Sequence, residues 1–264
     1  MTENKIVNIF WTGGWDSTYR IVELSRIPVS IQPIYINDPS RLSQEQELSA
    51  MNTITQLLQQ RKQTQAVFLP IKQINLSSLP CDSRVEKAWK SIASTIHIGT
   101  QYKWLPVVAK KYPGIELCIE KPSGPRGGCT STLHKFGKLI QNPDKSFKLD
   151  VAASTPECSA LFENVTFPIL SLTEHDMLAN IKAWQYEDIM KHIWFCNNPL
   201  QNHCCGMCVP CIQKMTKEMD FLLDSSAQAR YFKMKSLAKF VGGTRVASKL
   251  MREFYKIYAR FAKL

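Results

Sequence analysis

The stretch "FWTGGWDSTYR", which runs from Phe10 to Arg20, decides the fold of this chain. It follows an apolar run with β-branched residues, so we expect Lys5 to Trp11 to form a buried strand. The glycine pair Gly13-Gly14 stops that strand, and Asp16 or Ser17 is suited to begin a helix. The stretch therefore predicts a tight glycine turn between a strand and a helix.

The alternation of strand and helix continues along the chain. Val29 to Ile36 predicts a second strand, in which Pro33 indicates an edge position or a bulge. Apolar residues recur at helical spacing over residues 43–60, and residues 66–71 predict a third strand. This pattern predicts an α/β fold, in which a parallel sheet carries helices on both faces.

The pattern is weaker in the middle of the chain. Residues 98–111 predict a helix and residues 115–120 predict another strand. The loop from Lys121 to Thr132 is rich in Gly, Pro and Ser, which suits a substrate lid or a connector. Thr173 predicts the N-cap of a later helix, with Asp176 at its third position.

The glycine turn also has the chemistry of an anion site. A helix N-terminus offers free backbone N–H groups, and glycine lets the backbone approach phosphate oxygens closely. Asp16 is suited to cap the turn or to help hold Mg²⁺, and no Gly-Lys-Ser/Thr follows, so this is not a Walker A loop. The alternative is a turn without a ligand, which would not need several hydroxyl groups. The hydroxyl groups are those of Thr12, Ser17 and Thr18.

A second motif, "CNNPLQNHCCGMCVPC", supplies cysteines at the spacing C-x8-C-x2-C-x2-C. Its predicted metal ligands are Cys196, Cys205, Cys208 and Cys211. Four thiolates in so short a segment suit tetrahedral Zn²⁺ in a structural role, with an iron–sulfur cluster as the alternative. His203 and Cys204 are competing ligands, but using Cys204 would lose the C-x2-C interval to Cys208.

Composition bounds the class of protein. The chain has 264 residues, of which 44% are hydrophobic, and no apolar run approaches the length of a membrane span. Nine cysteines without a secretory signal favour a reducing compartment, so we expect a cytoplasmic protein with no membrane partner. We expect an α/β domain over residues 1–211, which includes the cysteine motif, and a basic helical extension over residues 212–264.

The extension holds most of the positive charge. Residues 212–264 contain twelve Lys and Arg against four Asp and Glu, so +8 of the net charge of +11 lies there. Two amphipathic helices are predicted, broken at Gly242-Gly243. We expect their apolar stripe to dock on the core, another subunit or a partner protein, in preference to nucleic-acid binding by the basic face. The stripe consists of Val246, Leu250, Phe254, Ile257 and Phe261.

The segment "TGGWDS" resembles the Ser-Gly-Gly-x-Asp-Ser loop of the N-type ATP pyrophosphatases. Together with the cysteine spacing, Trp194 and "FPILSLTEHDML", it is similar to the 7-cyano-7-deazaguanine synthase family. The resemblance implies an adenine nucleotide alpha-hydrolase-like fold in a homodimer with zinc. It implies an ATP site, with Asp16 and Ser17 as the catalytic pair, formed by Phe10, Trp11, Thr12, Gly13, Gly14, Trp15, Asp16, Ser17, Thr18, Tyr19 and Arg20.

The resemblance also implies an activity. ATP and Mg²⁺ would adenylate the carboxylate of a 7-deazaguanine, and ammonia would displace AMP on the way to the nitrile of queuosine biosynthesis. The loop "EKPSGPRGGCTST" over residues 120–132 and the basic extension depart from the family pattern. A divergent relative would stop at the amide or join the activated acid to another amine, such as a protein terminus. The remaining alternatives are a tRNA-thiolating enzyme and a zinc-bearing interaction module with a vestigial ATP site.

Overall fold

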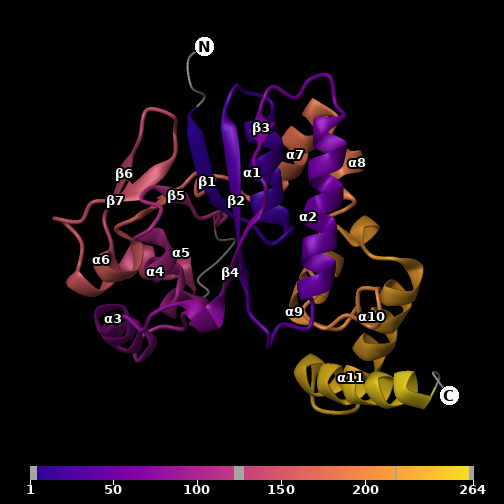
Figure 1. Ribbon diagram of the computed structural model, residues 1–264. Coiled ribbons are helices and arrows are strands. Elements are labelled where there is room, and N and C mark those ends of the chain that lie inside the picture. The colour runs from indigo at the N-terminus through magenta and orange to yellow at the C-terminus, as the bar shows by residue number, and fades with distance from the viewer. Residues whose placement is uncertain (1–4, 122–127, 218, 262–264) are drawn as a thin grey trace. The chain divides into compact units, whose positions relative to one another are not determined.

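The computed structural model describes residues 5–121, 128–217 and 219–261, and the side chains of the last helix as far as Tyr255. Its strands form one eight-stranded sheet (Figure 1). The strands are β1 Ile6–Phe10, β2 Ser30–Asn37, β3 Val67–Phe68, β4 Lys72–Asn75, β5 Ile115–Glu116, β6 Leu139–Gln141, β7 Phe147–Leu149 and β8 Val165–Phe167.

Helices connect these strands and fill the C-terminal part of the chain. The α-helices are α1 Trp15–Ser25, α2 Gln44–Gln59, α3 Ser83–Ala93, α4 Leu105–Ala109, α5 Cys129–Phe136, α6 Pro156–Phe162, α7 Glu174–Trp184, α8 Glu187–Met190, α9 Val209–Thr216, α10 Ser225–Ala238 and α11 Thr244–Phe261. Short 3₁₀ helices are η1 Leu76–Ser78, η2 Thr100–Lys103 and η3 Asp220–Leu222.

The sheet is mostly parallel, as the alternation predicts. Its strand order is β3-β2-β1-β5-β8-β7-β6, with β4 also paired to β2. Strand β1 lies between parallel neighbours, so that Ile9 is opposite Pro33 on one side and Glu116 on the other. The exception is the hairpin of β6 and β7, which adds antiparallel strands beside β8 and was not predicted.

Pro33 does not mark an edge strand, so that part of the prediction is wrong. Strand β2 is paired with β1 along one side and with β3 and then β4 along the other. The pairing partners on the second side change between Ile31 and Ile34, and Pro33 falls in this interval. The Gln32 side chain crosses the same interval and donates to the Pro70 carbonyl at 2.8 Å. Pro33 is therefore accepted in an inner strand at a break in the ladder.

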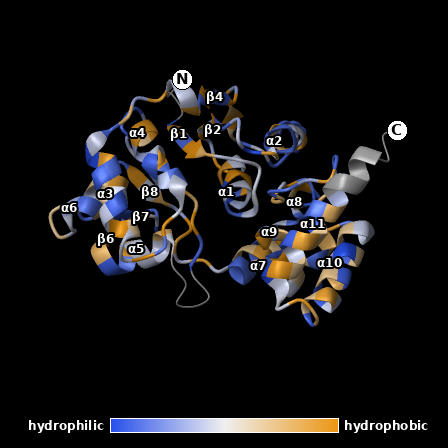
Figure 2. Ribbon diagram, turned by 90° about the horizontal axis from the view of Figure 1, so that it is seen from below, coloured by the Kyte–Doolittle hydropathy of each residue, from blue (hydrophilic) through white to orange (hydrophobic). Residues whose placement is uncertain are grey.

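Both faces of the central strands are buried. On one face, Phe10, Ile34 and Ile36 join a core that includes apolar residues of α3, α4, α5 and α6. Ile9, Ile31 and Tyr35 alternate with them and are fully buried on the other face. Figure 2 shows α4 and α1 on different sides of β1 and β2. The prediction of helices on both faces is thus confirmed for these strands.

Several local predictions have a clear outcome. Thr173 and Asp176 form the predicted capping box of α7. Residues 98–111 form η2 and α4 instead of one helix, with a proline at the start of α4 where a helix accepts it. The strand predicted over residues 115–120 is limited to Ile115–Glu116.

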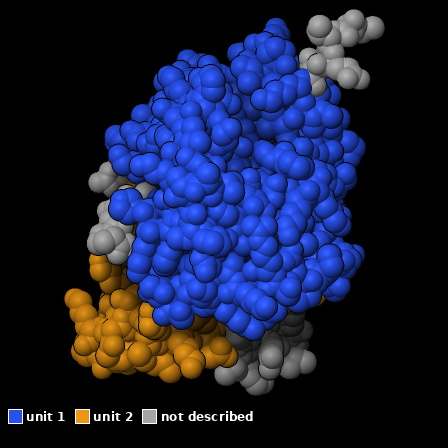
Figure 3. All heavy atoms as spheres, turned by 90° about the vertical axis from the view of Figure 1, so that its left-hand side faces the viewer, with its two compact units in different colours: residues 1–38, 51–192 blue, residues 39–50, 193–264 orange. Residues whose placement is uncertain are grey.

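The chain divides into two compact units, coloured separately in Figure 3. Unit 1 comprises residues 1–38 and 51–192, and unit 2 comprises residues 39–50 and 193–264. The sheet belongs to unit 1, whereas the cysteine motif and the C-terminal helices belong to unit 2. The boundary expected between residues 211 and 212 falls inside unit 2.

The C-terminal helices break where predicted, because Gly242 and Gly243 both have positive φ angles. Of the predicted apolar stripe, the described residues Val246, Leu250 and Phe254 are 44%, 52% and 62% exposed. The neighbouring Ala247 is fully buried and forms the inner side of α11 instead. The side chains of Ile257 and Phe261 lie outside the described part. None of the described helices is long and apolar enough to span a bilayer.

Candidate functional site

The glycine turn joins the end of β1 to the start of α1. Gly13 has a φ of +71°, a conformation that strongly favours glycine. Gly14 is the N-cap of α1 in extended conformation and gives the helix no side-chain cap. The first i to i−4 bond of the helix runs from the Thr18 amide to the Gly14 carbonyl at 3.0 Å. The first-turn amides are thus arranged as in an anion site.

The turn lies at the switch point of the sheet. From β1 the chain moves to β2 and the strands beyond it, whereas β5 lies on the opposite side of β1. In open α/β sheets, ligands bind outside the carboxyl ends of the strands at such a reversal of direction. The predicted site residues from Trp11 to Ser17 follow the carboxyl end of β1 and therefore stand where the topology favours a ligand.

The aromatic residues of the predicted site form its framework. Phe10 joins the core, and the fully buried Trp11 donates from Nε1 to the Thr18 hydroxyl at 2.9 Å. Trp15 is buried as well. Tyr19 accepts a hydrogen bond from Asn180 and stacks on Trp184, with 5.6 Å between ring centroids. Burial raises the pKa of Tyr19 to about 12, so its hydroxyl stays protonated.

Three predicted residues remain accessible at the turn. Thr12, Gly14 and Asp16 are half-buried, whereas Ser17 and Thr18 are buried. The structure thus places the whole predicted stretch in one strand–turn–helix unit, but its side chains do not all face the same way. The side chains of the turn that solvent reaches are those of Thr12 and Asp16.

Arg20 is engaged in an ion-pair network. Its guanidinium makes a bidentate contact with Glu116, at 2.8 Å and 2.7 Å, and a further bond to Glu23 at 2.6 Å. Burial opposes the charge of Arg20, but the hydrogen bonds that it donates to Glu116 and Glu23 outweigh this effect and raise the pKa of Arg20. Arg20 therefore links α1 to β5 through this ion pair. Sequence reasoning missed Glu116, because it is 96 residues away and no local pattern indicates the contact.

Cys118 follows β5 and also belongs to the surroundings of the turn. Burial raises the pKa of its thiol well above the ordinary value, and the carboxylates of Glu116 and Asp16 add to this. Burial likewise raises the pKa of Cys129. Both thiols are neutral at physiological pH and are poor nucleophiles. Residues 122–127 of the suggested substrate lid lie outside the described chain.

The second predicted site gathers the four cysteines of the motif. All four sulfur atoms lie within 4.8 Å of one another and are buried. The Sγ–Sγ distance is 3.9 Å between Cys196 and Cys208, and 3.4 Å between Cys208 and Cys211. A tetrahedral ion with Zn–S bonds of about 2.3 Å separates its ligands by ~3.8 Å. The cluster fits a single ion such as zinc, because irons and sulfides would need the ligands further apart.

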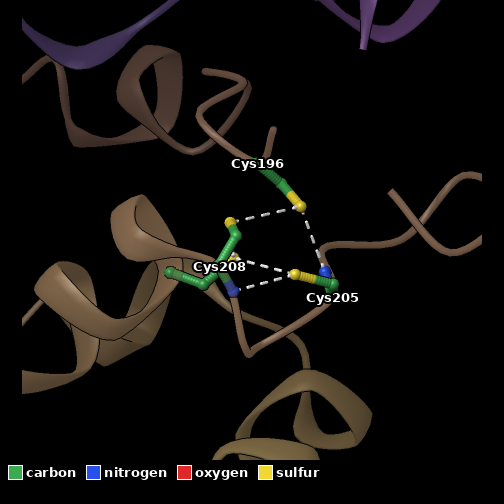
Figure 4. A group of neighbouring side chains, drawn as sticks. Cys196, Cys205 and Cys208 are labelled. Atoms are coloured by element: carbon green, nitrogen blue, oxygen red, sulfur yellow. Dashed lines mark hydrogen bonds between the residues drawn. The ribbon is translucent and has the colours of Figure 1, made fainter. Parts of the chain in front are cut away.

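Backbone amides donate hydrogen bonds to two of the clustered sulfur atoms. The Cys208 amide donates to Cys205 Sγ and the Cys205 amide donates to Cys196 Sγ, each at 3.2 Å (Figure 4). The Met207 amide also donates to Cys205 Sγ, at 3.3 Å. Hydrogen bonds from the neighbouring thiols, that of Cys204 first, lower the pKa of Cys196. Such donors stabilise metal-bound sulfur.

The two competing ligands are not part of the cluster. Cys204 is buried beside it but is not one of the four grouped ligands. His203 is exposed, and its Nδ1 lies 3.2 Å from the carboxylate of Asp224, the N-cap of α10. The ligand set chosen from the cysteine spacing therefore agrees with the geometry.

No protein-family model matches this chain, and no curated protein matches it either. Its family is thus not identified by comparison. The two sites stand on their own geometry: a glycine turn at the switch point of a parallel sheet and a buried cluster of four cysteines.

The ion pair of Arg20 provides a test of its structural role. We expect Glu116→Leu to lower the free energy of unfolding by about 3 kcal/mol, because it leaves a largely buried guanidinium with one carboxylate. Arg20→Met with Glu116→Leu should recover part of this loss. The exposed pair of Arg84 and Glu163 is the control, and Arg84→Met should cost less than about 1 kcal/mol. Urea unfolding of these variants measures the loss of stability at each pair. Equal losses at the Arg20–Glu116 and Arg84–Glu163 pairs would contradict the structural role of Arg20.

We expect the purified protein to contain about one Zn²⁺ per chain at the four-cysteine site. Cys208→Ser should lose the metal and lower thermal stability, because metal binding contributes to folding. Cys204→Ser is the matched control and should keep both, since Cys204 is buried in the same loop but outside the ligand set. Elemental analysis together with thermal unfolding measures the outcome. Iron with sulfide, or metal loss in Cys204→Ser alone, would show the assignment to be wrong.

Proposed function

We propose that this protein is an ATP-dependent ligase that adenylates a carboxylate and then lets an amine displace AMP. The observation that carries the proposal is the position of the Gly13-Gly14 turn, at the carboxyl end of β1 and at the switch point of the sheet. A turn with Gly13 in the left-handed region and no side-chain cap at Gly14 suits close approach by phosphate oxygens.

The residues of the turn fit ATP and Mg²⁺. Backbone amides from Gly13 to Ser17 would hold the phosphates, and the half-buried Asp16 in the first turn of α1 would hold the metal ion. Bound Mg²⁺ supplies neutralisation of the charge that develops on the phosphates. Adenylation needs orientation and charge stabilisation but no protein nucleophile. The neutral thiol of Cys118 agrees with this requirement.

The resemblance of "TGGWDS" to the pyrophosphatase loop narrows the reaction. It supports cleavage between the α- and β-phosphates in an adenine nucleotide alpha-hydrolase-like fold. The combination with the cysteine motif supports a 7-deazaguanine-type carboxylate as substrate, ammonia as acceptor, structural zinc, and a cytoplasmic homodimer. An amine on a larger molecule is the alternative acceptor.

The cysteines favour the ligase over a tRNA-thiolating enzyme. Thiolation requires reactive thiols or an iron–sulfur cluster, whereas the four clustered cysteines here have the spacing of a single ion. Of the remaining cysteines, Cys118, Cys129 and Cys158 all have raised pKa values, chiefly through burial. A protonated thiol is a weak nucleophile.

The products of turnover test the reaction class. With ATP, Mg²⁺, ammonia and 7-carboxy-7-deazaguanine we expect AMP and pyrophosphate, because the loop lacks the lysine that contacts β- and γ-phosphates. Asp16→Ala should abolish turnover and keep the fold, whereas Glu187→Ala, at an exposed first-turn acid of α8, should leave turnover unchanged. Chromatography of nucleotides and mass spectrometry of the products give the answer. ADP as the main product would refute the proposal.

The backbone of the turn is tested by a matched pair of glycines. Gly13 and Gly114 have φ angles of +71° and +80°, so alanine at either position should destabilise the protein by about 1 kcal/mol. Gly114 precedes β5 at the opposite end of the strands. We expect Gly13→Ala to weaken ATP·Mg²⁺ binding at least tenfold in isothermal titration, and Gly114→Ala to leave it unchanged. Equal affinities in both variants would show that the turn does not bind the nucleotide.

A further inference from the structure

We infer that the two C-terminal helices are part of the metal centre, with Arg230 of α10 and Ser248 of α11 as positioning residues for the ligand loop. The inference rests on the cysteine cluster as a metal site and is independent of the ATP chemistry. Arg230 lies 25 and 26 residues beyond the two loop residues whose carbonyls it binds, and Ser248 lies 41 residues beyond its partner.

Arg230 holds two carbonyls of the ligand loop. Its Nη2 donates to the Cys204 carbonyl at 2.8 Å and its Nε donates to the Cys205 carbonyl at 3.0 Å. The guanidinium also lies over the ring of Tyr255 in α11, 5.9 Å from the centroid. The planar guanidinium of Arg presents several N–H donors in a rigid arrangement and binds two acceptors at once. The ammonium of a lysine is a compact charge without this arrangement.

Ser248 holds a third carbonyl from the other helix. Its hydroxyl donates to the Met207 carbonyl at 2.6 Å, and the side chain is buried in unit 2. Met207 stands between the ligands Cys205 and Cys208 and is itself fully buried. The carbonyl edge of the loop is therefore bound by donors from both α10 and α11.

These contacts set the direction of the amides that face the sulfur atoms. A trans peptide is planar, so its C=O and the following N–H point in opposite directions. The peptide between Cys204 and Cys205 accepts from Arg230 through its carbonyl, and its amide donates to Cys196 Sγ. The peptide between Met207 and Cys208 accepts from Ser248 through its carbonyl, and its amide donates to Cys205 Sγ. Each helix thus orients one donor toward a ligand sulfur.

Close packing makes this arrangement feasible. Gly206 has a φ of +74°, and a Cβ there would lie 2.0 Å from the Ala227 carbonyl oxygen of α10. Ala227 and Ala247 are fully buried and belong to the same apolar cluster as the four ligands. Small side chains let both helices approach the loop. Arg230 also brings a positive charge toward a site in which four thiolates and Zn²⁺ would have a net charge of −2.

The direct test is the zinc affinity of full-length variants, measured by competition with a chelator. Arg230→Met should weaken zinc binding between tenfold and a hundredfold, the range found for partners of metal ligands, and Ser248→Ala should weaken it about tenfold. Arg230→Lys should recover only part of the affinity, because it keeps the charge without the planar guanidinium. Lys233→Ala and Lys249→Ala are exposed controls on the same helices and should bind like the wild type.

Two readouts separate positioning from general instability. In Co²⁺-loaded protein, Arg230→Met and Ser248→Ala should change the thiolate-to-metal absorption, whereas the lysine variants should not. Hydrogen exchange after metal removal should show loss of protection in α10 and α11, with β1 unchanged. Wild-type affinity and spectrum in both positioning variants would overturn the inference. Unchanged protection of α10 and α11 without metal, or a wild-type chain that binds no metal, would overturn it as well.

Discussion

Strand β1 is hydrogen-bonded to parallel neighbours on both sides, and the architecture of unit 1 depends on this pairing. Ile9 is opposite both Pro33 and Glu116, so β1 is paired on both sides near its carboxyl end, where the chain leaves it. Gly13 provides the backbone conformation for that exit, and α1 then packs with Tyr19 and other buried side chains. The position of the glycine turn is therefore a consequence of sheet topology as much as of local sequence.

The local part of this arrangement is readable from the sequence. The strand, the turn and α1 were predicted from an apolar run, two glycines and polar residues suited to a helix start. The hairpin of β6 and β7 was missed because its pairing with β8 joins segments without a strong alternating pattern. Pro33 was misread for a related reason: two successive strands share one side of β2, and only the tertiary structure shows the break between them.

The candidate sites divide in the same way. Cysteine spacing indicates the four cysteines that the structure brings together, because a tetrahedral site needs closely spaced thiolates from a short segment. It did not indicate Arg230 or Ser248, since the direction of a loop carbonyl is decided by the helices that pack against it. Likewise, no residue near Arg20 in the sequence indicates a contact with Glu116. The structure shows that the Arg20 guanidinium is bound by this carboxylate.

Both sites use a glycine with positive φ, but for opposite purposes. At Gly13, with φ +71°, the turn leads into α1, whose N-cap Gly14 provides no side-chain cap. This is the geometry on which the proposed anion site rests. At Gly206, with φ +74°, the loop places its carbonyls against α10 and α11 and its amides against sulfur. A side chain at Gly206 would strike the Ala227 carbonyl oxygen, so that glycine is required for packing. The same backbone conformation thus occurs in two different settings. In unit 1 it leads into a helix whose N-cap offers no side chain, and in unit 2 it lies in a loop whose carbonyls and amides are hydrogen-bonded to helices and to sulfur.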